Sequence, residues 1–344
     1  MNEEKMLYNV SGAPFVRAKT DTRRIMLDVL IALLPALCVA AYQFGAKAIL
    51  LVAVSVASCV FFEWGYRKLM KKPSSIGDLS ACVTGVLMVY CMPSAATWWM
   101  VVIGAFFAIV IVKQLYGGIG KNFLNPALAG RAFLLSYPAL MTTWLVPTSL
   151  KGSVDGSTMA TPLSGLYGGT AEEMPFSMMD LFLGNIPGCI GEISAAALIL
   201  GGLYLIVRKV IGWQIPVTYI GTVAVLTLLF GREGYGHVEW MLYNLFSGGL
   251  MLGAFFMATD YCTSPVTPKG QLIFGVGCGC LTVLIRYFGG YPEGVSYAIL
   301  IMNLLTWAID KATPQRQFGV SREEMKAAKQ AAKAEKKAAK EAKA

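Results

Sequence analysis

Charged residues are scarce in this chain of 344 amino acids. Only 14% of its residues are charged and 56% are hydrophobic, whereas a soluble globular protein carries roughly 25% charged residues. So few charges cannot cover the surfaces of the about two soluble domains expected for a chain of this length. The composition therefore excludes an ordinary cytosolic enzyme, a disordered chain and a nucleic-acid-binding domain, and it predicts an integral membrane protein.

Side chains for hydrolytic or metal chemistry are also few. His237 is the single histidine, which provides neither a catalytic triad nor a histidine metal cluster, and no metal site built by this chain alone is expected. The cysteines show no C-x-x-C spacing, so we expect them to act as small buried apolar side chains, with Cys189 exposed. A metal centre shared with another protein of a complex stays open. Because no catalytic side chain is predicted, redox or transport work would require a bound cofactor or ion.

Long hydrophobic runs are what the chain does have. A helix needs about 20 apolar residues to cross a hydrocarbon layer of ~30 Å. Continuous apolar runs favour helices over barrel strands, because the strands of a membrane barrel alternate apolar and polar residues within ~10-residue segments. The sequence therefore predicts an all-α polytopic membrane protein with about ten transmembrane helices. These fall at residues 25–44, 47–66, 79–92, 95–112, 123–141, 190–207, 213–230, 240–258, 271–288 and 294–309.

A long connection at residues 142–189 divides the predicted spans into two sets, residues 25–141 and 190–312. Because each set has an odd number of crossings, the second set would lie inverted relative to the first. Inverted repeats with glycine- or proline-interrupted segments frame a site near the membrane midplane. Glycine-rich segments are common in any membrane bundle. The distribution of glycines alone therefore leaves two alternatives, an inverted repeat or an ordinary glycine-rich bundle.

The distribution of basic residues predicts the orientation. Of the 29 Lys and Arg residues, 24 lie on one side of the predicted spans, and the positive-inside rule places that side in the cytoplasm. Residues 1–24 and 313–344 are therefore expected in the cytoplasm, and the loop 142–189 outside it. The first apolar run is too long for a signal-peptide core, so we expect it to be retained. The Lys- and Ala-rich tail favours a basic helix near anionic headgroups or beside an acidic partner.

Four acidic residues lie near predicted span ends: Asp28, Glu63, Asp260 and Asp310. Charged groups at such depths are costly and usually face a partner, a cavity or a cofactor. We expect each to pair with a neighbouring Lys or Arg, and Asp260 is the best single candidate for an ion-path carboxylate.

Residues 155–163 of the outside loop form a hydroxyl-rich turn. Long structured loops are more often functional than short ones. Pro162 biases Thr161 toward extended geometry, from which we expect the threonine hydroxyl to point outward. From composition alone, the segment is simply a turn.

Three segments resemble a known family. Residues 22–36, TRRIMLD followed by LLPA, resemble the start of the D-type subunit (RnfD) of Rnf-type ion-pumping ferredoxin:NAD oxidoreductases. Residues 117–127, GGIGKNFLNPA, are similar to a segment shared by that protein and the B-type subunit of the sodium-pumping NADH:quinone reductase. Residues 155–161 fit the family's flavinylation motif, Asp-x-x-Ser/Thr-x-Ala-Thr. The resemblance extends over about residues 11–312.

The motif implies a covalent flavin. In such motifs a flavin transferase joins FMN through its phosphate to the last threonine, which is Thr161 here. Asp155, Thr158 and Ala160 match the other motif positions, and Met159 stands where the family usually has glycine.

The resemblance also implies a second, non-covalent flavin, riboflavin, within the helix bundle. Lys121, Asn122, Asn125 and Arg131 are candidates to hold it, because they are polar groups in or beside the fifth predicted span. Alternatively, the two asparagines cap a broken helix next to a proline.

By resemblance, the chain is a flavin-bearing membrane component of a bacterial cytoplasmic-membrane (inner-membrane) complex. It would relay electrons between ferredoxin and NAD, coupled to Na+ or H+ transport, without being catalytic alone. The implied partners are the other membrane and peripheral subunits, a flavin transferase and the lipid bilayer, and no nucleic acid. Two alternatives remain. The chain could be a component like the B-type subunit of a sodium-pumping quinone reductase, or it could be a flavin-free channel or secondary transporter.

Overall fold

The computed structural model describes residues 20–150, 158–167, 176–232, 234–290 and 293–314. The motif residue Asp155 and the basic tail from residue 315 lie outside these ranges. Within them the fold is helical, and β-structure is limited to two isolated bridges, Pro93 with Cys189 and Leu145 with Thr158. The expectation of an all-α protein is confirmed for this part of the chain.

Helices occur in all ten segments predicted as spans. In the first half they are α1 (Thr22–Phe44), α2 (Ala46–Leu69), α3 (Ser80–Tyr90), α4 (Trp98–Phe106) continued by the π-helix η2 (Phe107–Gln114), and α5 (Pro126–Leu134) followed by α6 (Pro138–Met141). In the second half they are α9 (Ala195–Val207), α10 (Gln214–Leu229), α11 (His237–Phe246), α12 (Leu250–Leu252) continued by the π-helix η4 (Gly253–Met257), α13 (Pro268–Phe288) and α14 (Val295–Ala312). The intervening loop contains the short helices α7 (Pro162–Tyr167) and α8 (Met178–Leu183).

Four of these helices, α1, α2, α13 and α14, are long and apolar enough to cross a membrane. The α11 segment and the α12–η4 segment form a fifth candidate that is bent by 62°. Shorter apolar helices are α3, α4 with η2, α9 and α10. The chain is thus a polytopic helical membrane protein, and the number of ten crossings stays a prediction.

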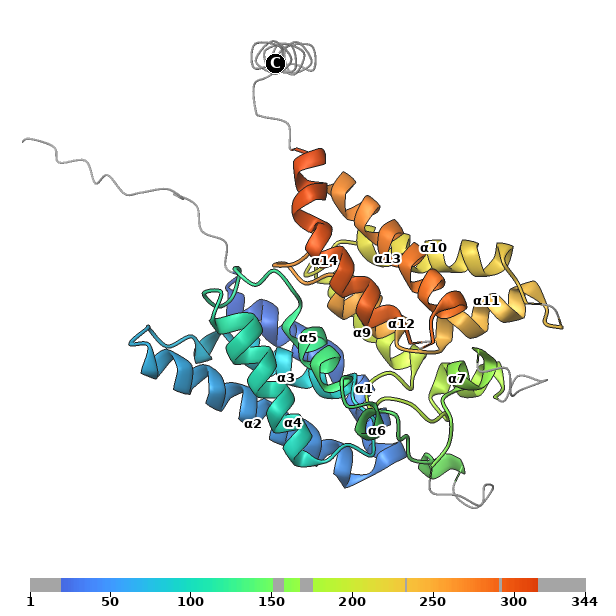
Figure 1. The fold of residues 1–344 in the computed structure, drawn as a ribbon, viewed down its shortest axis with the longest axis horizontal. Coiled ribbons are helices and arrows are strands. Elements are labelled where there is room, and N and C mark those ends of the chain that lie inside the picture. Colours follow the sequence, from blue (N-terminus) through green and yellow to red (C-terminus); the bar gives the residue numbers. More distant parts are fainter. Residues whose placement is uncertain (1–19, 151–157, 168–175, 233, 291–292, 315–344) are drawn as a thin grey trace, which may run out of the picture.

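The two halves of the chain gather on either side of the molecule, as Figure 1 shows in blue to green and in yellow to red. The helices α1 and α9 pack against each other where the halves meet. This contact brings backbones together, because a Cβ added to Gly201 of α9 would lie 2.1 Å from the carbonyl oxygen of Ala32 in α1. Small residues allow such close helix crossings in membrane bundles.

Local sequence explains where the irregular spans break. The side chain of Asn125 accepts a hydrogen bond from the amide of Ala127 at 3.0 Å and so caps α5, with Pro126 at the first helical position that suits proline. Pro138 separates α5 from α6, because proline disfavours helical geometry in the residue before it.

The eighth predicted span, 240–258, is not one continuous helix. Gly248 and Gly249 both have φ of +68°, a left-handed conformation that glycine adopts without steric cost. This pair breaks the helix between α11 and α12, so the eighth predicted span is interrupted at these two glycines.

Candidate functional site

Thr161 lies at the start of α7, in the loop between the two halves. Its hydroxyl donates to Ser164 Oγ at 3.0 Å and accepts from the Ser164 amide at 3.3 Å. The residue is only 4% exposed. The expectation that the threonine hydroxyl points outward is therefore wrong: the proline after it begins α7, and α7 packs its own first turn against the hydroxyl.

The neighbouring motif residues are held by a bridge to an earlier part of the same loop. Thr158 pairs with Leu145, and the Met159 amide donates to the Trp144 carbonyl at 3.1 Å. Thr158 and Ala160 are exposed, whereas Met159 is half-buried. In the motif, Thr158 and Ala160 thus lie on the protein surface, whereas the last threonine, Thr161, is buried.

The helix α7 is tied to the second half of the bundle. The Tyr167 hydroxyl donates to Asn244 Oδ1 at 2.8 Å, and Arg232 donates to the Leu166 carbonyl at 2.5 Å. Asn244 also accepts from Arg286, whose side chain is 1% exposed. A buried guanidinium therefore lies close to the segment that carries Thr161, which fits a phosphate ester on that residue.

A cavity of about 210 Å³ lies in the bundle beside the loop that precedes α5. Asn122 and Asn125 line it together with Ser80, Lys113 and Asp260. The structure therefore brings together two of the four residues predicted for a second flavin. Lys121 is exposed and Arg131 belongs to a separate cluster.

The asparagines in this cavity also have structural roles. Asn125 caps α5 and donates to the Met257 carbonyl at 3.3 Å, so the alternative of a helix cap is confirmed for this residue. Asn122 donates to the Leu124 carbonyl at 3.1 Å. Amide groups with these roles still leave lone pairs or N–H groups for a ligand.

Two charged groups give the cavity its polarity. Lys113 Nζ donates to Glu63 Oε2 at 2.8 Å and to Ser80 Oγ at 2.6 Å, and both members of this ion pair are buried. Burial raises the pKa of the Asp260 carboxyl above its ordinary value, although a hydrogen bond from Thr263 opposes the shift. Lys113 was not singled out from the sequence, where the only indication was a basic residue at the end of an apolar run.

The expected basic partners exist for two of the four acidic residues near span ends. Glu63 pairs with Lys113, and Asp28 pairs with Arg208 at 3.1 Å. Asp310 instead accepts a hydrogen bond from the Val266 amide at 3.1 Å, and Asp260 accepts one from Thr263 at 3.1 Å.

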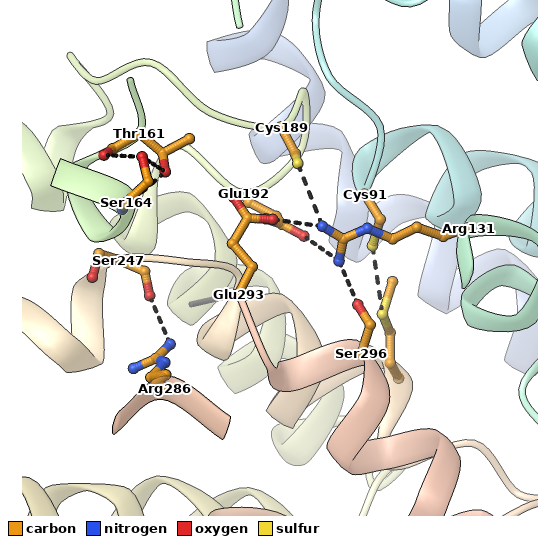
Figure 2. A network of polar contacts seen from close by, with 11 residues as sticks. Cys91, Arg131, Thr161, Ser164, Cys189, Glu192, Ser247, Arg286, Glu293 and Ser296 are labelled. Atoms are coloured by element: carbon orange, nitrogen blue, oxygen red, sulfur yellow. Dashed lines mark hydrogen bonds and ion pairs between the residues drawn. The ribbon is translucent and has the colours of Figure 1, made fainter. Parts of the chain in front are cut away.

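Arg131 is the centre of a second buried cluster, shown in Figure 2. Its guanidinium lies 2.6 Å from Glu293 Oε2 and 3.8 Å from Glu192 Oε1, and it also donates to Ser296 Oγ. Cys189 Sγ lies 3.9 Å from Arg131 Nη2. Cys189 is buried, so the expectation of an exposed thiol at this position is wrong: the bridge to Pro93 holds it inside.

The ligand atoms of Cys189, Glu192 and Glu293 lie within 4.8 Å of one another, a spacing that could hold a metal ion. Arg131, however, already places a positive charge beside both carboxylates. A cation would have to displace this guanidinium, so the arrangement favours an ion-pair cluster.

Comparison with known proteins agrees with this architecture. The family described as "NQR2, RnfD, RnfE family" matches residues 9–319. The D-type subunit of the Na+-translocating ferredoxin:NAD+ oxidoreductase complex of Acetobacterium woodii is 51% identical over 325 residues, covering 94% of this chain and 98% of the relative. The D-type subunit of the proton-translocating ferredoxin:NAD+ oxidoreductase complex of Clostridium ljungdahlii is 43% identical, covering 93% of this chain and 98% of the relative.

A more distant relative, the D-type subunit of the ion-translocating oxidoreductase complex of Shewanella amazonensis, is 39% identical and is covered over 99% of its length. These proteins match 91–94% of the chain rather than one segment of it. The chain therefore belongs to the NQR2, RnfD, RnfE family, among relatives that are subunits of the ion-translocating ferredoxin:NAD oxidoreductase complex.

Proposed function

We propose that this chain is the flavin-bearing membrane component of an ion-translocating redox complex, which relays electrons between ferredoxin and NAD and couples them to Na+ or H+ transport. The observation that carries the proposal is the 51% identity to the Acetobacterium woodii protein over 98% of that relative's length. The relatives are named for different ions, sodium in one and protons in another, so the proposal leaves the ion open between these two.

The first cofactor in this proposal is FMN, attached through a phosphate ester to Thr161. When bound, a flavin supplies the one- and two-electron chemistry that the protein side chains lack. The chain's own contribution is to fix the attachment point: α7 is anchored through Tyr167 and Leu166 to the second half of the bundle. Because Thr161 is 4% exposed, a flavin transferase needs the loop to open, or it acts before the loop packs.

The second cofactor in this proposal is riboflavin in the cavity beside α5. Asn122 and Asn125 would hold polar atoms of the ring system, and Lys113 and Asp260 would set the charge around it. Ligand sites in helix bundles combine an apolar lining with a few such polar groups. The lining here includes Phe255 and other apolar side chains.

We further propose that the two halves form inverted five-helix repeats, with both termini in the cytoplasm and the α7 loop on the opposite side of the bacterial inner membrane. The order of packing supports this: α2 contacts α3 and α4, as α10 contacts α11 and α13. The excess of basic residues on one side supports the orientation. The other subunits of the complex are the partners in this proposal.

The covalent flavin is tested on the full chain co-expressed with a flavin transferase. After denaturing electrophoresis, the wild-type band should fluoresce under ultraviolet light, because an ester-linked flavin survives denaturation. Thr161→Ala should abolish the fluorescence. Thr142→Ala, which changes an exposed threonine of the same loop, is the matched control and should keep it. A dark wild-type band would overturn the proposal, and a fluorescent Thr161→Ala band would move the attachment site.

A further inference from the structure

We propose that Arg286 binds the phosphodiester through which the flavin is joined to Thr161. This assignment rests on the proposed covalent flavin and adds the residue that holds its charged group. It concerns a side chain of α13, a helix that is far from the flavinylation motif in the sequence.

The guanidinium of Arg286 is buried among neutral acceptors. It donates to the Asn244 carbonyl at 2.6 Å, to Asn244 Oδ1 at 3.3 Å and to the Ser247 carbonyl at 3.2 Å. Its Nε is buried and has no hydrogen-bond partner in the described part of the chain. Figure 2 shows the guanidinium directed away from its own helix toward Ser247.

None of the described carboxylates forms an ion pair with Arg286, although its side chain is only 1% exposed. The acid whose charge acts on it is Glu293, but that carboxylate lies 2.6 Å from Arg131. A buried charge without a close counter-charge is strongly unfavourable. Arg286 therefore lacks an anion, and its orphan N–H indicates where one would bind.

The segment that carries Thr161 lies next to this guanidinium. A Cβ added to Gly248 would lie 2.7 Å from Leu163 Cδ2 and 3.3 Å from Arg286 Nη2, so one glycine is flanked by both side chains. Tyr167, at the other end of α7, shares the acceptor Asn244 Oδ1 with Arg286. The short helix that begins after Thr161 thus shares two neighbours with Arg286, Gly248 near its start and Asn244 at its end.

The burial of Thr161 makes a counter-charge necessary. A phosphodiester on a side chain that is 4% exposed would carry a negative charge into a region from which water is largely excluded. Arginine is the side chain best suited to such a group, because its planar fork donates two parallel hydrogen bonds to phosphate oxygens. Two otherwise unfavourable features, an unpaired buried cation and a buried anion, would then neutralise each other.

The test is a thermodynamic cycle on the full chain, purified in detergent. Wild-type and Arg286→Gln chains are each made with and without the flavin transferase, and their melting temperatures are compared. Attachment should raise the melting temperature of the wild-type chain by at least about 2 °C, because it supplies the missing counter-charge. The rise should disappear in Arg286→Gln. The steady-state anisotropy of the attached flavin should also fall in this variant, because its anchor is lost.

Arg232→Gln is the matched control, since Arg232 also contacts α7 but through the Leu166 carbonyl and from an exposed position. It should keep the flavin-dependent rise. An equal rise in Arg286→Gln and wild type would overturn the assignment, because a purely structural arginine stabilises both forms alike. If Arg286→Gln does not fold, Arg286→Met, which also removes the positive charge, replaces it, and a rise as large as in wild type would overturn the assignment. A chain without covalent flavin would overturn the proposed function itself, which the gel detects independently.

Discussion

At the scale of single residues, the interior is notable for the charges it contains. Glu63 and Lys113 are 1% and 3% exposed and lie 2.8 Å apart. Such a pair contributes little net stability relative to apolar residues, but removal of one partner leaves the other uncompensated. The polar neighbours Ser75 and Ser80 also hydrogen bond to this pair, so both charges are satisfied only when the whole group is present.

We therefore expect Lys113→Met to destabilise the chain by about 3–5 kcal/mol, because it leaves the Glu63 carboxylate buried without a cation. Thermal unfolding of the purified chain in detergent measures this loss. The double variant Lys113→Met with Glu63→Gln should recover much of it. A double variant no more stable than Lys113→Met alone would contradict the charge argument.

A second prediction at this scale concerns the riboflavin proposed in the cavity. Asn122→Ala removes an amide that lines the cavity without capping a helix. It should lower the affinity for non-covalent flavin about fivefold, which corresponds to the loss of one hydrogen bond. Flavin released by acid extraction of the purified chain measures this. Lys121→Ala, at the adjacent exposed position, is the control. Equal flavin content in both variants would remove Asn122 from the site.

At the scale of elements, the crossing of α1 and α9 depends on the absence of a side chain. The Cβ of an alanine at position 201 would lie 2.1 Å from the Ala32 carbonyl oxygen, and a backbone atom cannot rotate away as a side chain can. We expect Gly201→Ala to destabilise the chain by about 3 kcal/mol, at the upper end of the usual overpacking cost.

The control for this prediction is Gly221→Ala in α10, where an added Cβ meets nothing within 4 Å. Alanine has the higher helix propensity, so this change should be neutral or slightly stabilising. The melting temperatures of both variants, measured in the same detergent, test this prediction. Similar losses in the two would mean that α1 and α9 do not depend on close backbone contact.

At the scale of the whole molecule, the distribution of charge predicts which way the bundle faces. In the ten-span topology predicted from the sequence, most basic residues lie on the side that holds both termini, which favours a cytoplasmic location for them. A fusion of alkaline phosphatase to Ala344 should be inactive and a fusion of green fluorescent protein there should be fluorescent. A phosphatase inserted after Gly169 should be active. The opposite pattern would invert the proposed orientation.

The sequence predicted the helices well, because the length of each apolar run is set by the apolar environment that the helix must cross. It also predicted that Asn125 could cap a broken helix, since that signal is local. It failed where the decisive contact is distant in the chain. The burial of Thr161 depends on how α7 packs, and no spacing rule connects Arg131 with Glu293 or Arg286 with Asn244.

The break in the eighth segment is an intermediate case. Gly248 and Gly249 were visible in the sequence, but glycine is common inside membrane helices. Only their left-handed geometry distinguishes a bend from a packing surface. The candidate site is thus predicted in its motif, while the charged groups around it became apparent only from the folded arrangement.

The Arg131 cluster has a consequence for the order in which the protein can be made. Arg131 is synthesised with the first half, whereas its closest described carboxylate partner, Glu293, lies just before the last described helix, α14. Until α14 is inserted, the nascent first half holds a buried guanidinium without this counter-charge, which is costly. A chain that ends before Glu293 would therefore keep the Arg131 guanidinium without this partner.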